Sequence, residues 1–215
     1  MMIKIQKKWL KKFCGYSITG LVIEQLFTIF TGCGSNGKGV LNNILTKVFG
    51  HLCKPLNMSL VDARSQKDPR HELAKLDKVR IGIIDESELK SKLGGKFKLL
   101  TGSTPFTARA NYEDPVEIDP QFQIILLTNQ LPEIDPDKAT IRRLRVLDFP
   151  VTFVDNPVPS SLYERKKDND LEEELLKNKQ GILKWFVEAS KLYFDQGLKK
   201  TPKSMDKALE DYKSE

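Results

Sequence analysis

The sequence predicts an α/β domain in which a central, mainly parallel sheet is covered by helices on both faces. Short apolar runs alternate with helical patterns, as is typical of parallel strands buried on both faces. One of these runs leads through a glycine-rich loop directly into a helix. At 215 residues, the chain is long enough to bury one sizeable core.

The elements are expected in the following order. Ile5, Trp9 and Phe13 form an apolar stripe on a lysine-rich helix, which we expect to pack on the domain rather than lie on a membrane. Residues 27–31 predict a buried strand, and 38–49 the helix after the loop. The rest of the core comprises a short helix at 68–76, strands at 79–85, 122–129 and 143–149, and a hairpin at 106–119.

The C-terminal part differs in kind. Residues 156–170 predict a linker, and a helical stretch with one apolar side ends at Gly197. That side comprises Leu171, Leu175, Ile182, Phe186, Ala189 and Tyr193. We therefore divide the chain into an N-terminal helical lead-in (1–26), a core (27–155), and a linker with a helical segment that closes the core (156–215).

Charge and composition narrow the class of protein. The net charge is +6, but residues 1–110 carry +11 and residues 111–215 carry −5. A basic half suits a polyanion such as nucleic acid, although solvated lysines alone also produce it. No secretory signal or membrane-spanning run is present, so we expect an intracellular, cytoplasmic protein, in the host cytoplasm if viral.

Cysteine and histidine spacing argues against a built-in metal site. Cys14, Cys33 and Cys53 are far apart and are expected to be reduced, buried thiols. His51 and His71 match no metal-ligand spacing. If the protein uses a metal ion, we expect that ion to bind together with a nucleotide.

The stretch GCGSNGKG fits two phosphate-binding patterns. In GxxxxGK, backbone N–H groups and a helix N-terminus hold phosphates, and the lysine adds positive charge. In GxGxxG, the dinucleotide pattern, an acidic residue is needed about twenty positions on. No acid follows until Asp62, so GxxxxGK is favoured. Its loop residues are Gly32, Cys33, Gly34, Ser35, Asn36, Gly37, Lys38 and Gly39.

Polar residues follow the later strands where such a loop requires them. Asp85 and Glu86 end an apolar run, and we expect Asp85 to serve Mg²⁺ and Glu86 to polarise the attacking water. Asn129 ends the next strand, and its amide can both donate and accept hydrogen bonds, which suits a residue lying between the attacking water and the γ-phosphate. Arg142 and Arg143 are either a surface pair or groups that stabilise charge on a phosphate of a neighbouring subunit.

The order of these features resembles the superfamily 3 helicases, and within them the primase-helicases of poxviruses, other large DNA viruses, phages and plasmids. The matching segments are GYSITG, GCGSNGKG, VRIGIIDE, KLLTGSTPFTAR, FQIILLTNQLP, IRRLRVLDF and GILKWFVEASKLYFDQGLKKTP. They cover nearly all of the chain. In this order and spacing they are much more specific than any one of them alone.

The resemblance implies a P-loop ATPase of the AAA+ type that uses ATP and Mg²⁺. Such proteins assemble as rings, usually hexamers, around one DNA strand and move along it during DNA replication. Carried over by position, Lys38 is the phosphate lysine, Asp85 and Glu86 the acidic pair, and Asn129 the sensor. Arg142 or Arg143 is then the arginine finger that acts on a neighbouring subunit.

The resemblance also implies where DNA and further domains belong. The segment KLLTGSTPFTAR leads into a DNA-facing hairpin, which makes Lys98 and Arg109 candidates for phosphate contacts. Family members also carry a priming domain or collar region, and often a winged-helix domain, and neither fits within this length. We therefore expect a fragment, a split gene product or a minimal protein, with any priming domain on another chain.

Two departures from the family pattern keep three functions open. Gly39 stands where Ser or Thr usually ligates Mg²⁺, and the hairpin segment YEDPVEID is acidic where DNA would favour lysine. The first function is an ATP-driven helicase or translocase core. The second is a catalytically weakened nucleotide- and DNA-binding assembly module. The third is a small-molecule kinase built on the same loop.

Overall fold

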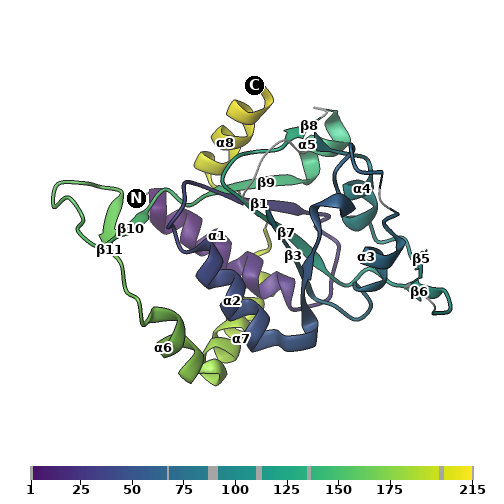
Figure 1. Cartoon of the computed structure of the whole chain (residues 1–215), viewed down its shortest axis with the longest axis horizontal. Coiled ribbons are helices and arrows are strands. Elements are labelled where there is room, and N and C mark those ends of the chain that lie inside the picture. The colour runs from purple at the N-terminus through teal and green to yellow at the C-terminus, as the bar shows by residue number, and fades with distance from the viewer. Residues whose placement is uncertain are drawn as a thin grey trace.

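A five-stranded parallel sheet forms the centre of the molecule (Figure 1). The computed structural model describes residues 2–66, 68–86, 92–109, 113–134, 137–198 and 201–214. In spatial order, the strands are β2 (Cys53–Leu56), β3 (Ile81–Glu86), β7 (Gln123–Thr128), β1 (Phe27–Thr31) and β9 (Leu144–Asp148). The predicted α/β fold with a parallel sheet is therefore confirmed.

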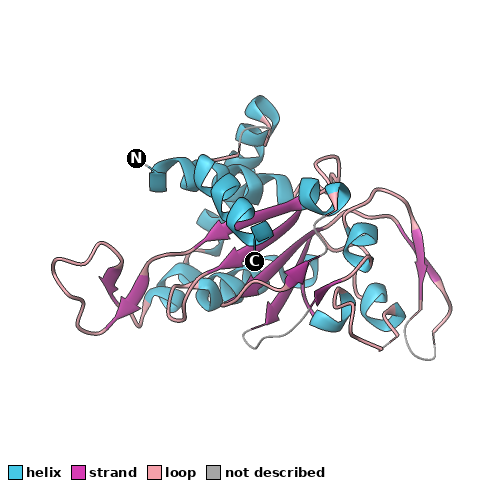
Figure 2. Ribbon diagram, turned by 90° about the horizontal axis from the view of Figure 1, so that it is seen from above, coloured by secondary structure: helices cyan, strands magenta, loops and turns pink. Residues whose placement is uncertain are grey.

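Helices lie on both sides of the strands (Figure 2). On one face, α1 (Met2–Ser17), α2 (Lys38–Phe49) and α7 (Lys179–Gln196) enclose a core that includes Trp9, Phe30 and Phe186. On the other face, α3 (Arg70–Ala74), α4 (Lys96–Leu100) and α8 (Lys203–Ser214) pack over Phe27 and Ile29. Alternate residues of each central strand face opposite cores, which explains why these strands are continuously apolar.

Two small β structures project from opposite ends of the molecule (Figures 1 and 2). The predicted hairpin is formed by β5 (Phe106–Ala108) and β6 (Val116–Ile118), which pair antiparallel. At the other end, β10 (Thr152–Val154) and β11 (Glu164–Lys166) pair in parallel. The prediction of a linker over 156–170 is thus wrong in part, because this stretch contains strand β11, which pairs with β10 outside it.

The C-terminal helical stretch is interrupted once. Asn178 separates α6 (Leu171–Lys177) from α7, and its side chain accepts a hydrogen bond from the Gly181 N–H at 3.0 Å. Gly197, with φ of 60°, ends α7 as predicted. The remaining elements are η1 (Gly50–Leu52), η2 (Met58–Leu60), β4 (Lys92–Leu93), β8 (Glu133–Ile134) and α5 (Lys138–Arg143).

The N-terminal helix packs on the domain, as its apolar stripe predicts. Trp9 and Phe13 stack with ring centroids 5.3 Å apart and lie in the same core as Tyr193 of α7. The side chain of Ile5 lies outside the described residues. Among the described helices, none has the length and apolar character needed to cross a membrane.

Candidate functional site: a phosphate-type loop at the carboxyl end of the sheet

The loop between β1 and α2 needs glycine at two of its positions. Gly32 and Gly37 have φ values of 137° and 87°, in the region that side chains avoid. A Cβ on Gly32 would lie 2.5 Å from the Phe149 carbonyl oxygen, whereas a Cβ on Gly34 would meet nothing within 4 Å. The two required glycines are those of GxxxxGK, and the middle glycine of GxGxxG is structurally free.

The strand order also excludes a dinucleotide-binding arrangement. In that fold, the strand that leads into the glycine loop lies beside the next strand along the chain. Here β1 lies between β7 and β9, and two strands separate it from β2. The loop therefore opens at a point where the strand order reverses, which is where ligands bind in open α/β sheets.

Lys38 is held inside the loop. Its ammonium donates hydrogen bonds to the Gly32 carbonyl oxygen at 2.7 Å and to Asn129 Oδ1 at 3.2 Å. Only 7% of the residue is exposed. This burial lowers the pKa of Lys38, while Cys33, Asp85 and Asp148 act in the opposite direction. The sequence did not single out Asp148, whose own pKa is raised, chiefly by burial.

The segment after β9 braces the loop from outside. Phe153 N–H donates to the Ser35 carbonyl oxygen at 2.7 Å, and Asn36 Nδ2 donates to the Phe149 carbonyl oxygen at 3.4 Å. Ser35 has a positive φ of 57°, so this contact supports an uncommon conformation. Cys33 is exposed, which contradicts the expectation of a buried thiol, because this part of the loop faces solvent.

The polar residues predicted from the sequence meet at the carboxyl end of the strands, beside the loop. Asp85 lies beside Leu127 in the register of β3 and β7, and Asn129 follows β7 directly. Asp85 is exposed, and its Oδ2 accepts a hydrogen bond from Asn42 Nδ2 of α2 at 3.0 Å. Glu86 is the last residue of β3, and its side chain lies outside the described residues.

The donor set fits a metal that is carried by a nucleotide. Mg²⁺ is usually bound through one or two carboxylates together with substrate phosphates. Within the described residues, no three His, Cys, Asp or Glu side chains gather as a metal site of their own. Asp85 supplies one exposed carboxylate, so the residues fit Mg²⁺ only in company with phosphates.

Arg142 and Arg143 lie at the amino end of the strands, opposite the loop. They end α5 just before β9, and Leu144 at the start of β9 pairs with Phe27 at the start of β1. Arg142 is exposed and donates to the Gln25 side chain at 3.0 Å. Arg143 donates to the Ala139 carbonyl oxygen at 2.8 Å. Burial lowers the pKa of Arg143.

The two predicted DNA contacts are engaged within the chain. Lys98 forms an ion pair with Asp137 at 2.7 Å, and Arg109 Nε donates to the Glu113 carbonyl oxygen at 2.8 Å. The hairpin's described residues include the exposed acids Glu113, Asp114, Glu117 and Asp119. Residues 110–112, at the tip, lie outside the described residues.

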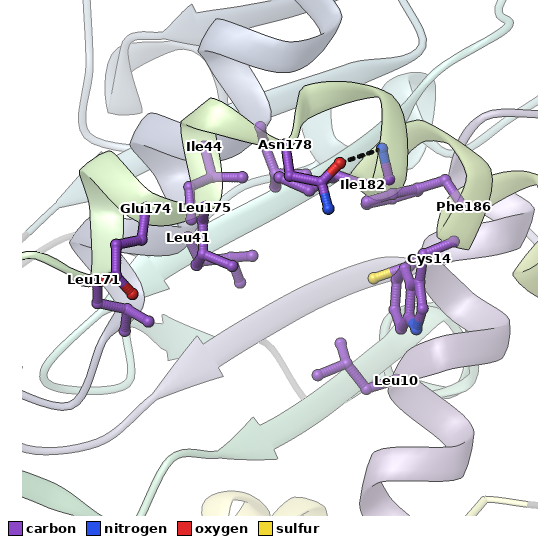
Figure 3. A pocket seen from close by; sticks show the side chains of 13 residues that line it. Leu10, Cys14, Leu41, Ile44, Leu171, Glu174, Leu175, Asn178, Ile182 and Phe186 are labelled. Atoms are coloured by element: carbon purple, nitrogen blue, oxygen red, sulfur yellow. Dashed lines mark hydrogen bonds between the residues drawn. The ribbon is translucent and has the colours of Figure 1, made fainter.

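Two hollows flank the helices next to the loop. The larger, of about 710 Å³, lies between α1, α2, α6 and α7, and its wall is apolar apart from Glu174 and Asn178 (Figure 3). The smaller, of about 290 Å³, adjoins the loop and is lined by Asn36, Asp148, Phe149 and Phe153, with Gln6 and Leu10 of α1. The smaller hollow therefore borders the loop at Asn36.

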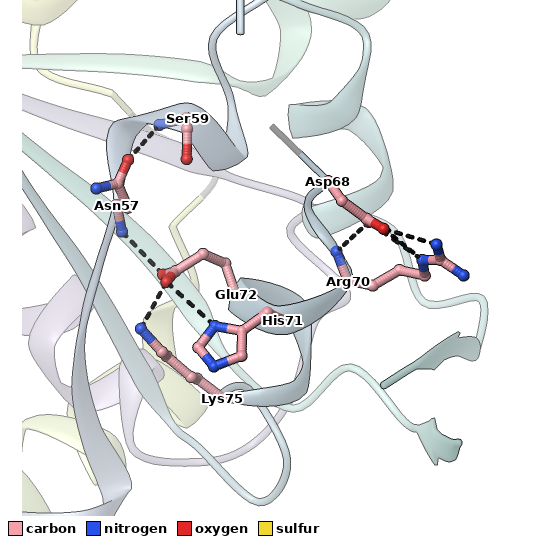
Figure 4. Close-up of polar contacts among 7 residues, drawn as sticks. All are labelled: Asn57, Ser59, Asp68, Arg70, His71, Glu72 and Lys75. Carbon is pink, nitrogen blue, oxygen red and sulfur yellow. Dashed lines mark hydrogen bonds and ion pairs between the residues drawn. The ribbon is translucent and has the colours of Figure 1, made fainter. Parts of the chain in front are cut away.

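A separate polar cluster around α3 is explained by local structure (Figure 4). Glu72 accepts from the Asn57 N–H at 3.1 Å and from Lys75 Nζ at 2.5 Å. His71 Nδ1 lies 3.8 Å from a Glu72 oxygen. The cluster joins α3 to the chain before η2, and His71 takes part in it as a surface residue.

Comparisons with known proteins agree with this fold. A family model described as "Family of unknown function (DUF5906)" matches residues 30–143, which run from β1 to the end of α5. The structure of the NrS-1 C-terminal region matches with a TM-score of 0.59 at 19% identity, over 87% of this chain and 45% of that one. At this identity, the structural match supports the fold alone.

Relatives from DNA viruses match more of the sequence. The chain is 30% identical to "Putative helicase L207/L206" of Acanthamoeba polyphaga mimivirus over 207 residues, which is 91% of this chain and 22% of that protein. It is 33% identical to "Putative helicase 184R" of Invertebrate iridescent virus 6, over 67% of this chain and 16% of that protein. It is 27% identical to "Putative primase C962R" of African swine fever virus, over 74% of this chain.

The chain spans about a fifth or less of the length of these viral relatives. The names of these relatives bear out the resemblance to the helicase and primase proteins of large DNA viruses that the ordered motifs indicate, and the NrS-1 region agrees with the fold. The family model covers more than half of the chain. The chain therefore belongs to the DUF5906 family, within the helicase-like proteins of large DNA viruses.

Proposed function

We propose that this chain is the ATPase core of a DNA helicase or translocase that acts in viral, phage or plasmid DNA replication. The observation that carries the proposal is the position of Lys38, held between the Gly32 carbonyl oxygen and Asn129 Oδ1 at the carboxyl end of the sheet. Asp85 lies on the strand beyond β7 at the same edge. One lysine, one amide and one carboxylate thus surround the place where a helix N-terminus can receive phosphates.

The Lys38 ammonium donates hydrogen bonds to two protein oxygens. An incoming γ-phosphate replaces these neutral acceptors with a charged one, which makes a stronger hydrogen bond. Backbone N–H groups of residues 33–38 supply the remaining donors. The base of the nucleotide would enter the adjoining hollow of about 290 Å³, where Phe149 and Phe153 offer flat apolar walls.

Roles at the γ-phosphate follow from the chemistry of each group. Asn129 would orient the attacking water, since its amide both donates and accepts. Asp85 would hold Mg²⁺, which when bound neutralises charge on the β- and γ-phosphates. Glu86 would accept a proton from the water. The positive charge of an arginine finger would come from Arg142 or Arg143 of a neighbouring copy in a ring.

The test is ATP hydrolysis with and without single-stranded DNA, comparing the wild type with Lys38→Ala. DNA-stimulated hydrolysis that is lost by a factor of about 10² or more in Lys38→Ala supports the proposal. Gly34→Ala is the matched control, because that position is open and should retain activity. Absence of hydrolysis in the wild type, with Mg²⁺ and DNA present, would contradict it.

Gly39 favours a second candidate, a binding and assembly module that uses nucleotide only to stabilise a DNA-bound ring. The two candidates differ in how they respond to Gly39→Ser, which the open space at this position accommodates. A module without hydrolysis stays near zero in this variant. Measurable hydrolysis in the wild type, or a large rise in Gly39→Ser, would exclude the module.

A further inference from the structure

The absence of a hydroxyl at position 39 removes two interactions at once. In P-loop ATPases, the Ser or Thr at this position holds Mg²⁺ together with an acidic residue that ends another strand of the sheet. It therefore also joins the loop helix to that acid. A Cβ built on Gly39 would meet nothing within 4 Å, so no neighbouring atom fills the place of the missing side chain.

Asn42 reaches the same acid from one turn further along α2. Residues three apart lie on the same face of a helix, so Asn42 follows Gly39 on the face that borders the site. Asn42 Nδ2 donates to Asp85 Oδ2 at 3.0 Å. This contact joins residues 43 positions apart and links α2 to the end of β3.

The orientation of the Asn42 amide is set from both sides. Thr46 Oγ1, on the next turn of α2, donates to Asn42 Oδ1 at 3.5 Å. The amide oxygen is thereby directed along the helix and its NH₂ group toward the carboxylate. Asp85 Oδ2 is occupied by this bond, whereas none of the described residues bonds to Oδ1, which can therefore bind a cation or a water that the cation holds.

We propose that Asn42 is a positioning residue that takes the place of the missing P-loop hydroxyl as the link between α2 and Asp85. It fixes the carboxylate that binds the Mg²⁺ of the incoming nucleotide. The inference rests on the proposed function, because it concerns the nucleotide-borne metal. Outer-shell partners of this kind are worth about 10- to 100-fold in metal affinity.

The test measures Mg²⁺ affinity rather than turnover. A fluorescent methylanthraniloyl-ADP is bound to the protein without metal, and Mg²⁺ is titrated in. We expect Asn42→Ala to raise the Mg²⁺ concentration at half-saturation by about tenfold or more. Affinity for the nucleotide in EDTA should stay unchanged. Asn42→Leu, which keeps the shape but lacks the donor, should behave in the same way.

The neighbouring asparagine provides the matched control. Asn43 Nδ2 donates to Glu172 of α6 at 3.0 Å, away from Asp85. Asn43→Ala should therefore leave the Mg²⁺ titration as in the wild type. Alanine is favourable in a helix, so both alanine variants should fold, and thermal melts check this.

A rescue experiment tests whether Asn42 takes over the role of the hydroxyl that is missing at position 39. If Asn42 compensates for Gly39, then Gly39→Ser should restore most of the Mg²⁺ affinity lost in Asn42→Ala. An unchanged Mg²⁺ titration in Asn42→Ala, or purely additive effects of the two changes, would overturn the inference and leave the proposed ATPase standing. A wild type that binds no nucleotide would overturn both.

Discussion

Replacing Gly32 with alanine should damage the loop, and replacing Gly34 should not. At Gly32, φ is 137°, and an added Cβ would lie 2.5 Å from the Phe149 carbonyl oxygen and 2.8 Å from Asn36 Nδ2. Both neighbours brace the loop, so neither can move without loss. A side chain forced into such a backbone conformation costs about 1–3 kcal/mol. At Gly34, the open space and ordinary φ predict a change within about 0.5 kcal/mol.

The assay is thermal and urea unfolding of the two variants, followed by nucleotide binding. For a chain of this size, each kcal/mol shifts the Tm by about 2–4 °C. Gly32→Ala should therefore melt several degrees lower and lose nucleotide affinity, while Gly34→Ala retains both. Equal losses in the two variants would refute the reasoning, because GxGxxG needs its middle glycine and GxxxxGK does not.

Three further predictions follow from the described contacts. If the arginine finger acts between chains, an active interface needs an intact Lys38 from one copy and an intact Arg142 from the next. An equal mixture of the inactive variants Lys38→Ala and Arg142→Ala should therefore regain hydrolysis at about one interface in four. No recovery would exclude Arg142 as the finger. The Lys98 ammonium, with help from Thr140 and Ala139, holds the pKa of Asp137 well below its ordinary value of 3.8. Its stabilising effect is thus present above about pH 4 and is lost as pH falls further, so Asp137→Ala should lower the Tm at pH 7 more than at pH 2, and equal shifts would contradict this. Arg109→Ala should reduce the salt dependence of DNA binding by about one unit of slope, whereas Lys98→Ala, whose ammonium is already paired, should do so less.

Much of the fold could be predicted because its strands are buried on both faces. Such strands are continuously apolar, and the runs before Asp85 and Asn129 are of this kind. Strand β2 was missed because Lys54 and Pro55 interrupt its apolar pattern. It lies at the edge of the sheet, where proline is tolerated. The β10–β11 pair was missed because each strand depends on the other for its hydrogen bonds.

The candidate site could be predicted where a motif or a strand end marks its residues, and not where two unmarked side chains meet only in the folded chain. The pattern GxxxxGK identifies Lys38 without any structure. Asn42 carries no signal of its own in the sequence, since an asparagine on a helix is common. Its interest arises only from contact with Asp85, and Asp148 likewise becomes notable only because β9 ends beside the loop.

The distribution of charged groups over the sheet implies that Arg142 and Arg143 cannot act at the loop of their own chain. Lys38, Asp85 and Asn129 lie at the carboxyl end of the strands, whereas Arg142 and Arg143 precede β9 at the amino end. The register of β1 and β9 runs from Phe27–Leu144 to Thr31–Asp148, so about four residues, or roughly 13 Å of strand, separate these ends. An arginine side chain cannot span that length along the packed sheet to reach its own loop. If Arg142 or Arg143 acts at the γ-phosphate of the proposed site, it therefore acts on the loop of a second copy, and head-to-tail contacts of that kind close into a ring when their rotation allows it.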